Sequence, residues 1–257
     1  MKSIFLSVVI PSYNETENLR RGVLDEVASF LKKQDYSWEV IVSDDGSPDV
    51  QAKSLARDFC GRNENFFFLE NNHAGKPFAV WEGIQDAKGE IVLFTDMDQS
   101  TPISEINKLL PQFDQGYDIV IGSRGLGRKN FSLFRRLASA IFHEFRRSLL
   151  LPKIIDTQAG FKAMRLAVAQ EIFPLLQIFR QPAKAASGWK VTAFDVELLV
   201  AAQTRGYKVT EVEIDWEDRD ISKGKSKGTL KFVHESLEMI QETLRVKIND
   251  LRGDYKK

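Results

Sequence analysis

Two aspartates separated by one residue follow an apolar stretch in the first half of the chain. Asp96 and Asp98 come directly after residues 91–95, which have the length and composition of a buried strand. Carboxylates aimed at one point from such a turn can hold Mg²⁺ or Mn²⁺, with phosphate oxygens completing the coordination shell. The alternative is turn and cap chemistry, because Ser100-Thr101-Pro102 directly afterwards is typical of a helix start.

A second acidic pair occupies the same kind of place after residues 39–42, another apolar run. Asp44 and Asp45 open the segment Asp44-Asp45-Gly46-Ser47-Pro48-Asp49. At the end of a strand, one such carboxylate can accept a hydrogen bond from a ribose or a base. Taken alone, the segment also suits a capping turn.

The elements that must position these residues follow from the apolar pattern. Runs of strand length alternate with helical periods, which predicts a Rossmann-like α/β fold: a mixed, mostly parallel sheet flanked by helices in a single domain. The runs are residues 5–10, 39–42, 66–69, 91–95 and 119–121. Helical stretches follow around residues 131–150, 165–178 and 193–206, with a strand at residues 208–214. In such folds, ligands bind outside the carboxyl ends of the strands.

We expect a catalytic domain over residues 1–228 and an amphipathic helix with a polar tail over residues 229–257. The apolar positions of that helix recur at spacings of three and four, which favours packing on the domain. A dimer seam is the alternative use of the same face, so a homodimer stays open.

Composition narrows the class of protein. The 36 Lys and Arg residues balance the 36 Asp and Glu residues, so we expect no nucleic-acid partner. The single cysteine, Cys60, predicts a buried thiol and suits a reducing, cytoplasmic compartment. No run of about 18 uncharged apolar residues occurs, and no small-residue cleavage site follows the apolar N-terminus. We therefore expect neither a membrane-spanning helix nor a signal peptide.

Positive charge is concentrated between Arg124 and Arg147. Seven Lys or Arg residues stand there against the single acid Glu144, so the segment carries a charge of +6. As a helix, residues 131–149 would place apolar side chains on one side and cationic side chains on the other. Such a helix can lie in a membrane interface, or it can pack on the domain while its arginines bind phosphate. A solvated charged face over a buried stripe is the alternative.

The order of the motifs is more specific than any one of them. Pro-Ser-Tyr-Asn-Glu (residues 11–15), Asp-Asp-Gly-Ser (44–47), Asn-Asn-His-Ala-Gly-Lys (71–76) and Asp-Met-Asp (96–98) occur in sequence. Over residues 7–227 the chain resembles glycosyltransferase family 2, inverting enzymes of the GT-A fold. The resemblance implies a metal ion on Asp96 and Asp98. It also implies a nucleotide-sugar site formed by Pro11, Tyr13, Glu15, Asp44, Asp45, Lys76, Asp96 and Asp156.

Two later segments resemble one branch of that family. Asp156-Thr157-Gln158-Ala159-Gly160-Phe161-Lys162 and Phe194-Asp195-Val196-Glu197-Leu198-Leu199 are similar to segments of dolichyl-phosphate β-glucosyltransferases and related polyprenyl-phosphate enzymes. The similarity favours UDP-glucose over GDP-mannose as donor and a polyprenyl phosphate as acceptor. Ala159 stands where Cys is commoner, and Ser100 stands where mannosyl enzymes have a metal-contacting Gln. The donor and the third metal ligand therefore stay open.

Cationic residues in the second half are the expected ligands of an acceptor phosphate. Arg135 and Ser139 match an R-x-x-x-S pattern of the family, with Arg124 nearby in the sequence. Arg219 and Lys227 bound a loop that resembles the family's R…G-x-S-K segment. A flexible cationic loop of this kind can close over a diphosphate and exclude water. An ordinary exposed linker is the alternative.

The expected reaction is in-line displacement at an anomeric carbon, with catalytic roles for Asp96, Asp98, Arg124 and Asp195. A phosphate acceptor is already an anion at pH 7, whereas a sugar hydroxyl would need a general base, with Asp195 or Glu197 as candidates. The alternatives are a soluble enzyme that glycosylates a sugar hydroxyl in polysaccharide or glycolipid synthesis, and a non-catalytic nucleotide-binding subunit. For a lipid acceptor we expect a peripheral protein at the cytoplasmic membrane face, on the membrane surface or with a membrane-anchored partner.

Overall fold

Seven strands form one sheet in the order β3-β2-β1-β4-β6-β5-β7. The computed structural model describes residues 3–125, 150–180, 194–221 and 229–256. Within these residues only β6 runs antiparallel to its neighbours, β4 and β5, so the predicted mixed, mostly parallel sheet is confirmed. The strands are β1 (Leu6–Ser12), β2 (Trp38–Asp44), β3 (Phe66–Glu70), β4 (Ile91–Phe94), β5 (Ile119–Ser123), β6 (Lys162–Arg165) and β7 (Val209–Glu213).

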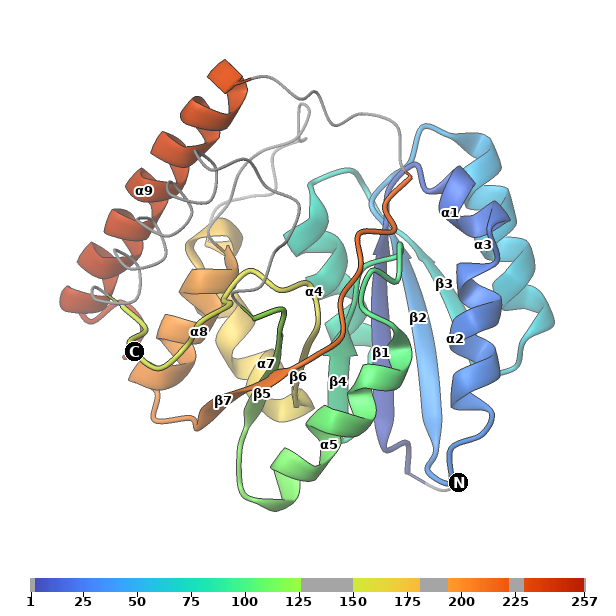
Figure 1. Ribbon diagram of the computed structural model, residues 1–257, viewed down its shortest axis with the longest axis horizontal. Coiled ribbons are helices and arrows are strands. Elements are labelled where there is room, and N and C mark those ends of the chain that lie inside the picture. The colour runs from blue at the N-terminus through green and yellow to red at the C-terminus, as the bar shows by residue number, and fades with distance from the viewer. Residues whose placement is uncertain (1–2, 126–149, 181–193, 222–228, 257) are drawn as a thin grey trace.

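Helices cover both faces of this sheet (Figure 1) because successive strand side chains point to opposite sides. Val8 and Ile10 of β1 belong to an apolar core shared with α2 (Val23–Leu31), α3 (Val50–Arg62) and α5 (Ile106–Asp114). Val9, between them, belongs to the opposite core with α4 (Lys76–Asp86), α7 (Leu166–Ile172) and α8 (Phe194–Thr204). Burial on both faces explains why the strands read as continuous apolar runs.

The expected elements are found with small shifts at their ends. All five early strands are present, the strand expected at residues 208–214 is β7, and the helix expected at 193–206 is α8. The stretch at 165–178 is α7 followed by two short 3-10 helices, Phe173–Leu175 and Gln177–Phe179. The expected helix at 131–150 lies almost wholly outside the described residues. Cys60 is buried as predicted, and burial raises the pKa of its thiol to about 12.

The sheet reverses its winding direction at β1. Strand β2 pairs with one side of β1 and β4 pairs with the other. The chain therefore crosses to the opposite face through α4, and a crevice forms outside the carboxyl ends of β1 and β4. Ligand sites of open α/β sheets lie at such reversal points. The short helix α1 (Thr16–Arg20) and the 3-10 helix Ile103–Glu105 begin just beyond this edge.

The last helix, α9 (Thr229–Leu251), lies beside α8 at the far side of the molecule from α2 and α3 (Figure 1). Glu197 of α8, which is 1% exposed, accepts hydrogen bonds from the Tyr255 hydroxyl at 2.8 Å and the Gln177 amide at 3.1 Å. Arg245 of α9 lies 3.4 Å from the same carboxylate. Glu197 therefore fixes the C-terminal segment, and its suggested role as a general base is wrong.

None of the helices in residues 3–125, 150–180, 194–221 and 229–256 is long and apolar enough to cross a bilayer.

Replacing Tyr255 tests the anchor of the C-terminal segment. Tyr255→Phe removes the donor to the buried Glu197 carboxylate, so the free energy of unfolding should fall by about 2 kcal/mol. Tyr207→Phe is the matched control, because its hydroxyl binds the exposed Glu171, and it should cost well under 1 kcal/mol. Urea unfolding of both variants provides the measurement. Equal losses in the two would show that Glu197 does not anchor the segment.

Candidate functional site

Four acidic side chains converge at the reversal point of the sheet. Asp96 and Asp98 lie on the turn after β4, Glu15 follows β1, and Asp220 lies on the segment after β7. Burial raises the pKa of Glu15 to about 7, and the charges of Asp220, Asp98 and Asp96 add to the rise. The pKa of Asp98 is also raised, first by burial and then by Asp96 and Asp220. The acids repel one another, so this corner is prepared for a cation.

Asp96 and Asp98 have different surroundings, which bear on the metal-binding and capping roles considered for these two aspartates. Asp98 accepts a hydrogen bond from the Ser100 amide at 2.8 Å, which closes the turn. Gln99 has a φ of +48°, in the left-handed region that non-glycine residues rarely adopt. The Asp96 side chain is nevertheless 43% exposed. The turn is therefore capped by one carboxylate while the other faces outward.

Two neighbours fix the position of Asp96. Lys76, the first residue of α4, forms an ion pair with the Asp96 carboxylate. Gly160 packs on its other side, where an added Cβ would lie only 2.1 Å from Asp96 Oδ2. The charges of Asp96, Asp195 and Asp98 raise the pKa of Lys76 against the opposing effect of burial. A cation already sits on this carboxylate in the free protein.

The residues after β2 organise the adjoining loops. Asp44 binds within its own turn, accepting from the Ser47 amide at 2.8 Å and the Ser47 hydroxyl. Asp45 accepts hydrogen bonds from the amides of Ala74 and Gly75 at 2.9–3.0 Å. The capping turn considered for this pair therefore describes Asp44, while Asp45 holds the loop that leads to Lys76.

An aromatic face stands beside these loops. Tyr13 is 40% exposed and stacks on His73 with ring centroids 4.5 Å apart. His73 Nδ1 lies 2.9 Å from Asp45 Oδ2, which fixes the orientation of the imidazole. Pro11 precedes this group as a residue of β1. A hollow of about 500 Å³ lies next to it, lined in part by Asn14, Glu15, Thr16, Asn18 and Asp49.

Two further ion pairs lie on the β5 and β6 side of the corner. Arg124, directly after β5, binds Asp156 through Nε at 2.6 Å and Nη2 at 2.8 Å, and its guanidinium lies over Trp216. Lys162 of β6 is fully buried and lies 2.5 Å from Asp195 Oδ1. The pKa of Lys162 is lowered, chiefly by burial and against the effect of Asp195. Each expected catalytic charge here has a partner of opposite sign.

The structure brings most of the predicted site residues to this one edge. Arg219 is also at this edge, with its amide bonded to the Ser100 hydroxyl, but its guanidinium binds Glu26 at 2.9 and 3.0 Å. Arg135, Ser139 and Lys227 lie outside the described residues. Lys162 received no role in the sequence analysis, although a lysine at the start of Lys-Ala-Met-Arg, next to apolar Phe161, was the available signal. The roles of Gly160 and Trp216 were also not foreseen.

The donor set fits a divalent ion that a ligand helps to hold. The described residues contain no group of three or more His, Cys, Asp or Glu side chains placed to bind a metal. Asp96 and Asp98 supply hard carboxylate oxygens, and their mutual repulsion would be relieved by a dication. The remaining positions of an octahedral shell suit phosphate oxygens and water. These two side chains would therefore supply only part of a coordination shell.

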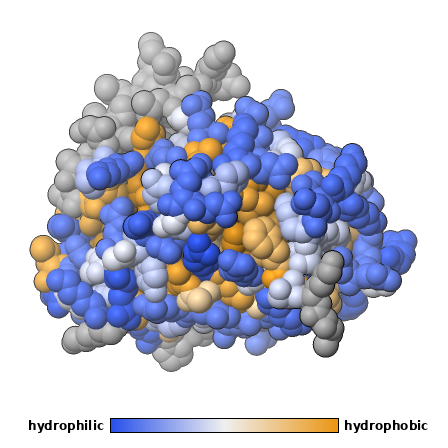
Figure 2. All heavy atoms as spheres, turned by 90° about the horizontal axis from the view of Figure 1, so that it is seen from below, coloured by the Kyte–Doolittle hydropathy of each residue, from blue (hydrophilic) through white to orange (hydrophobic). Residues whose placement is uncertain are grey.

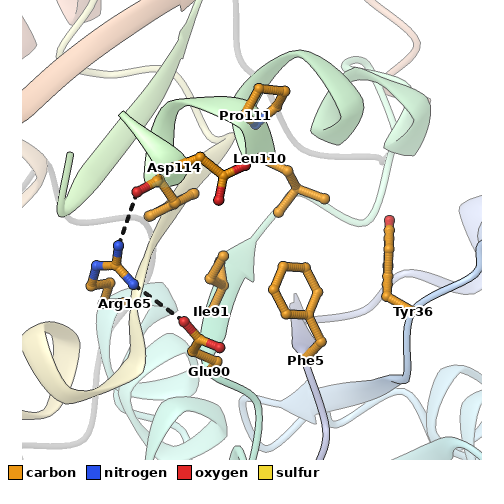
Figure 3. Close-up of a pocket in the computed structure, with 9 residues that line it drawn as sticks. Phe5, Tyr36, Glu90, Ile91, Leu110, Pro111, Asp114 and Arg165 are labelled. Atoms are coloured by element: carbon orange, nitrogen blue, oxygen red, sulfur yellow. Dashed lines mark hydrogen bonds and ion pairs between the residues drawn. The ribbon is translucent and has the colours of Figure 1, made fainter. Parts of the chain in front are cut away.

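Another hollow, of about 260 Å³, lies where the strands begin and not where they end (Figure 3). Phe5 and Tyr36 form one wall, while Arg165 reaches across to Glu90 and to the Phe113 carbonyl. Viewed from below, this end of the molecule is mainly hydrophilic, with a few apolar side chains near its centre (Figure 2). The hollow shares no residue with the acidic corner.

Comparison with known proteins decides the family. The Glycosyl transferase family 2 profile matches residues 7–173. The chain is 32% identical to the dolichyl-phosphate beta-glucosyltransferase of Dictyostelium discoideum, over 99% of this chain and 77% of that protein. The chain belongs to glycosyl transferase family 2. It is also 34% identical to the human dolichyl-phosphate beta-glucosyltransferase. That match covers 85% of this chain and 69% of the human protein.

Solved structures agree with this fold. Glucosyl-3-phosphoglycerate synthase from Mycobacterium tuberculosis, in complex with Mn²⁺, UDP-glucose and phosphoglyceric acid, is similar with a TM-score of 0.65 at 16% identity, covering 95% of this family 2 chain and 80% of that one. The mannosyltransferase PcManGT from Pyrobaculum calidifontis, in complex with GDP-Man and Mn²⁺, has a TM-score of 0.59 at 18% identity, with coverages of 95% and 64%. The predicted GT-A fold is confirmed.

The raised pKa of Glu15 predicts a pH dependence of stability in the metal-free protein. Its folded-state pKa of about 7 exceeds the ordinary 4.5, so its contribution to the free energy of unfolding is full below pH 4.5 and is lost as the pH rises through 7. Glu15→Gln keeps an acceptor for Asn18 but cannot ionise. Its stability relative to the parent chain should therefore rise by about 2 kcal/mol between pH 5 and pH 8. Urea unfolding at both pH values measures this difference, and a pH-independent difference would contradict the prediction.

Proposed function

We propose that this chain is a metal-dependent glucosyltransferase that moves glucose from UDP-glucose to a polyprenyl phosphate, with inversion at the anomeric carbon. The observation that carries the proposal is the Asp96–Asp98 turn at the sheet's reversal point, next to Lys76 and Glu15. The dolichyl-phosphate beta-glucosyltransferases that this chain resembles over most of its length support glucose and a lipid phosphate.

Asp96 and Asp98 would hold Mg²⁺ or Mn²⁺, and the bound ion would stabilise negative charge on the departing diphosphate. Lys76 is placed to follow that charge, because its ammonium group already contacts Asp96 and can turn to a phosphate oxygen. Burial would still raise the pKa of Glu15, but a bound cation would offset the smaller contribution from the charges of Asp220, Asp98 and Asp96. The four acids and Lys76 thus bind the donor through its diphosphate and ion together.

The nucleoside would lie on the aromatic face beside the β1 and β2 loops. Tyr13 offers a half-exposed ring that is held by His73. Asp45 fixes both His73 and the Ala74–Gly75 backbone. Stacking on a ring of this kind is open to either a uracil or a guanine base, so the UDP preference rests on the relatives. GDP-mannose is the second candidate donor.

The acceptor would approach from the side of Arg124 and Asp195. A proton taken up by Asp195 would leave the ammonium group of Lys162 buried without its counter-ion. This arrangement favours an acceptor that arrives ionised, as a phosphate monoester does at pH 7. Arg124 and its partner Asp156 would orient that phosphate, together with Arg135, Ser139, Arg219 and Lys227.

The rival functions differ in what they require of Asp195. Transfer to a sugar hydroxyl in polysaccharide or glycolipid synthesis needs a base, and Asp195 is the remaining candidate because Glu197 holds the C-terminal segment. A non-catalytic nucleotide-binding subunit needs neither a base nor a metal. For the lipid acceptor, the enzyme would work as a peripheral protein on the cytoplasmic face of a membrane. A homodimer through α9 is a further proposal that oligomeric-state measurements can test.

Radiolabelled UDP-glucose tests the donor and acceptor together. The purified chain, Mn²⁺ and a short polyprenyl phosphate should give label in an organic-extractable, mild-acid-labile product. GDP-mannose should give at least tenfold less product. Label in water-soluble glycans would favour a sugar-hydroxyl acceptor, and no turnover with any donor would favour the non-catalytic subunit.

Gly160→Ala tests the placement of Asp96. The new methyl group would lie 2.1 Å from Asp96 Oδ2, so the carboxylate must move by about 1 Å or more. The glucosyl transfer rate should fall by about 10²-fold. Gly61→Ala is the matched control, because nothing lies within 4 Å of a Cβ at that site on α3. It should leave the rate unchanged and slightly stabilise the helix. Equal rates in the two variants would contradict the proposed role of Asp96.

A further inference from the structure

The turn that begins at Asp96 and Asp98 is hydrogen-bonded to residues 217–219, more than a hundred positions later in the sequence. The Glu217 amide donates to the Ser100 carbonyl at 2.9 Å, and the Arg219 amide donates to the Ser100 hydroxyl at 3.0 Å. Residues 217–219 and the Asp96–Asp98 turn therefore move together.

One arginine joins both segments at once. Arg21, which ends α1, donates from Nη2 to the Asp98 carbonyl at 2.6 Å and from Nη1 to the Arg219 carbonyl at 2.9 Å. Both of these acceptors are main-chain carbonyls, so the guanidinium links two backbone segments. A planar fork with several donors can bridge two carbonyls in this way, whereas a lysine ammonium group is a point charge with a different geometry.

A second arginine, Arg219, links the same turn to helix α2. The Arg219 side chain forms a bidentate pair with Glu26 of α2 and reaches the Gln99 carbonyl at 3.4 Å. Every carbonyl from Asp98 to Ser100 thus accepts a bond from Arg21 or from residues 217–219. Helices α1 and α2 both contribute to holding this turn.

The turn needs this support because its backbone is strained. The φ of +48° at Gln99 lies in the left-handed region, which a non-glycine residue keeps only where neighbouring groups determine the conformation. If the Asp98 carbonyl were released, the peptide could relax and rotate the Asp98 side chain away from Asp96. The direction of a metal-binding carboxylate is thus set through its own main chain.

We propose that Arg21 is a positioning residue for the metal site: by clamping the Asp98 carbonyl to residues 217–219, it holds the Asp98 carboxylate toward the ion that Asp96 shares. The inference rests on the proposed function, because it requires Asp98 to be a metal ligand. Arg21 itself touches neither the substrate nor the metal. Its effect is on the affinity for the ion and not on the charge of the site.

Arg21→Lys keeps the positive charge and removes the fork. We expect the dissociation constant for Mn²⁺ in the presence of UDP to rise about tenfold or more, the usual effect of losing a group that orients a metal ligand. The concentration of free Mn²⁺, followed by electron paramagnetic resonance, measures the constant without turnover. In assays, the Mn²⁺ concentration needed for half-maximal rate should rise by a similar factor, while the rate at saturating Mn²⁺ changes less than threefold.

Arg20→Ala is the matched control, because this neighbouring arginine is half-exposed and pairs only with Glu17 among the ion pairs of the described residues. It should leave Mn²⁺ binding unchanged. Unchanged binding in Arg21→Lys would overturn the inference. If Arg21→Lys does not fold, Arg21→Gln decides, because its single side-chain amide can donate to one carbonyl but cannot bridge the two. A two- to fivefold weaker binding is then expected, and wild-type binding would overturn the inference.

Asp98→Asn separates failure of this inference from failure of the proposed function. Loss of Mn²⁺ binding in Asp98→Asn together with wild-type binding in Arg21→Lys would remove only the role of Arg21. Wild-type Mn²⁺ binding in Asp98→Asn would remove the metal site itself, and with it the proposed function. Thermal unfolding of each metal-free variant shows whether the change is confined to the ion.

Discussion

Carboxylates that converge on one point repel one another, and the fold must hold them there before any ligand arrives. Glu15, Asp96, Asp98 and Asp220 are brought together by three different strand ends, where burial first and the neighbouring acids second raise the pKa values of Glu15 and Asp98. The surrounding structure answers this repulsion in two ways. Lys76 forms an ion pair with Asp96, and the backbone around Asp98 is bonded to distant segments. A dication that binds between these carboxylates would reduce the repulsion among them.

The two other acids of the site, Asp156 and Asp195, each form an ion pair with a cation. Arg124 binds Asp156 and Lys162 binds Asp195. Breaking either pair would leave a partly buried charge alone, which costs more than the pair itself contributes. An arriving anion must therefore be accommodated without dissolving these pairs. A diphosphate satisfies this condition by bringing an ion with it, since the ion and not the protein then balances most of its charge.

Much of this arrangement could be predicted from the sequence, and the failures have physical causes. Apolar runs located the strands, and the rule that ligands lie beyond parallel strand ends led to Glu15, Asp45 and Asp96. Strand β6 was not predicted, because its four residues include two charges. The contact between Gly160 and Asp96 joins residues 64 positions apart, which local patterns do not encode. The misassigned Glu197 could have been avoided, because two residues along a helix place Asp195 and Glu197 on nearly opposite sides.

Asp195 and Glu197 point to different sides of α8, Asp195 toward Lys162 and Glu197 toward the C-terminal segment. Glu197 turns toward Tyr255 and Arg245, so the C-terminal segment is bound to the helix that carries Asp195. Asp195 turns to Lys162 at the start of β6, the strand that lies between β4 and β5. Movement of α9 would therefore reach Asp195 through one helix, whereas the Asp96–Asp98 turn is held by α1, α2 and the segment after β7. The two sides meet at the segment before β6, where Gly160 packs on Asp96 and Lys162, two residues later, pairs with Asp195.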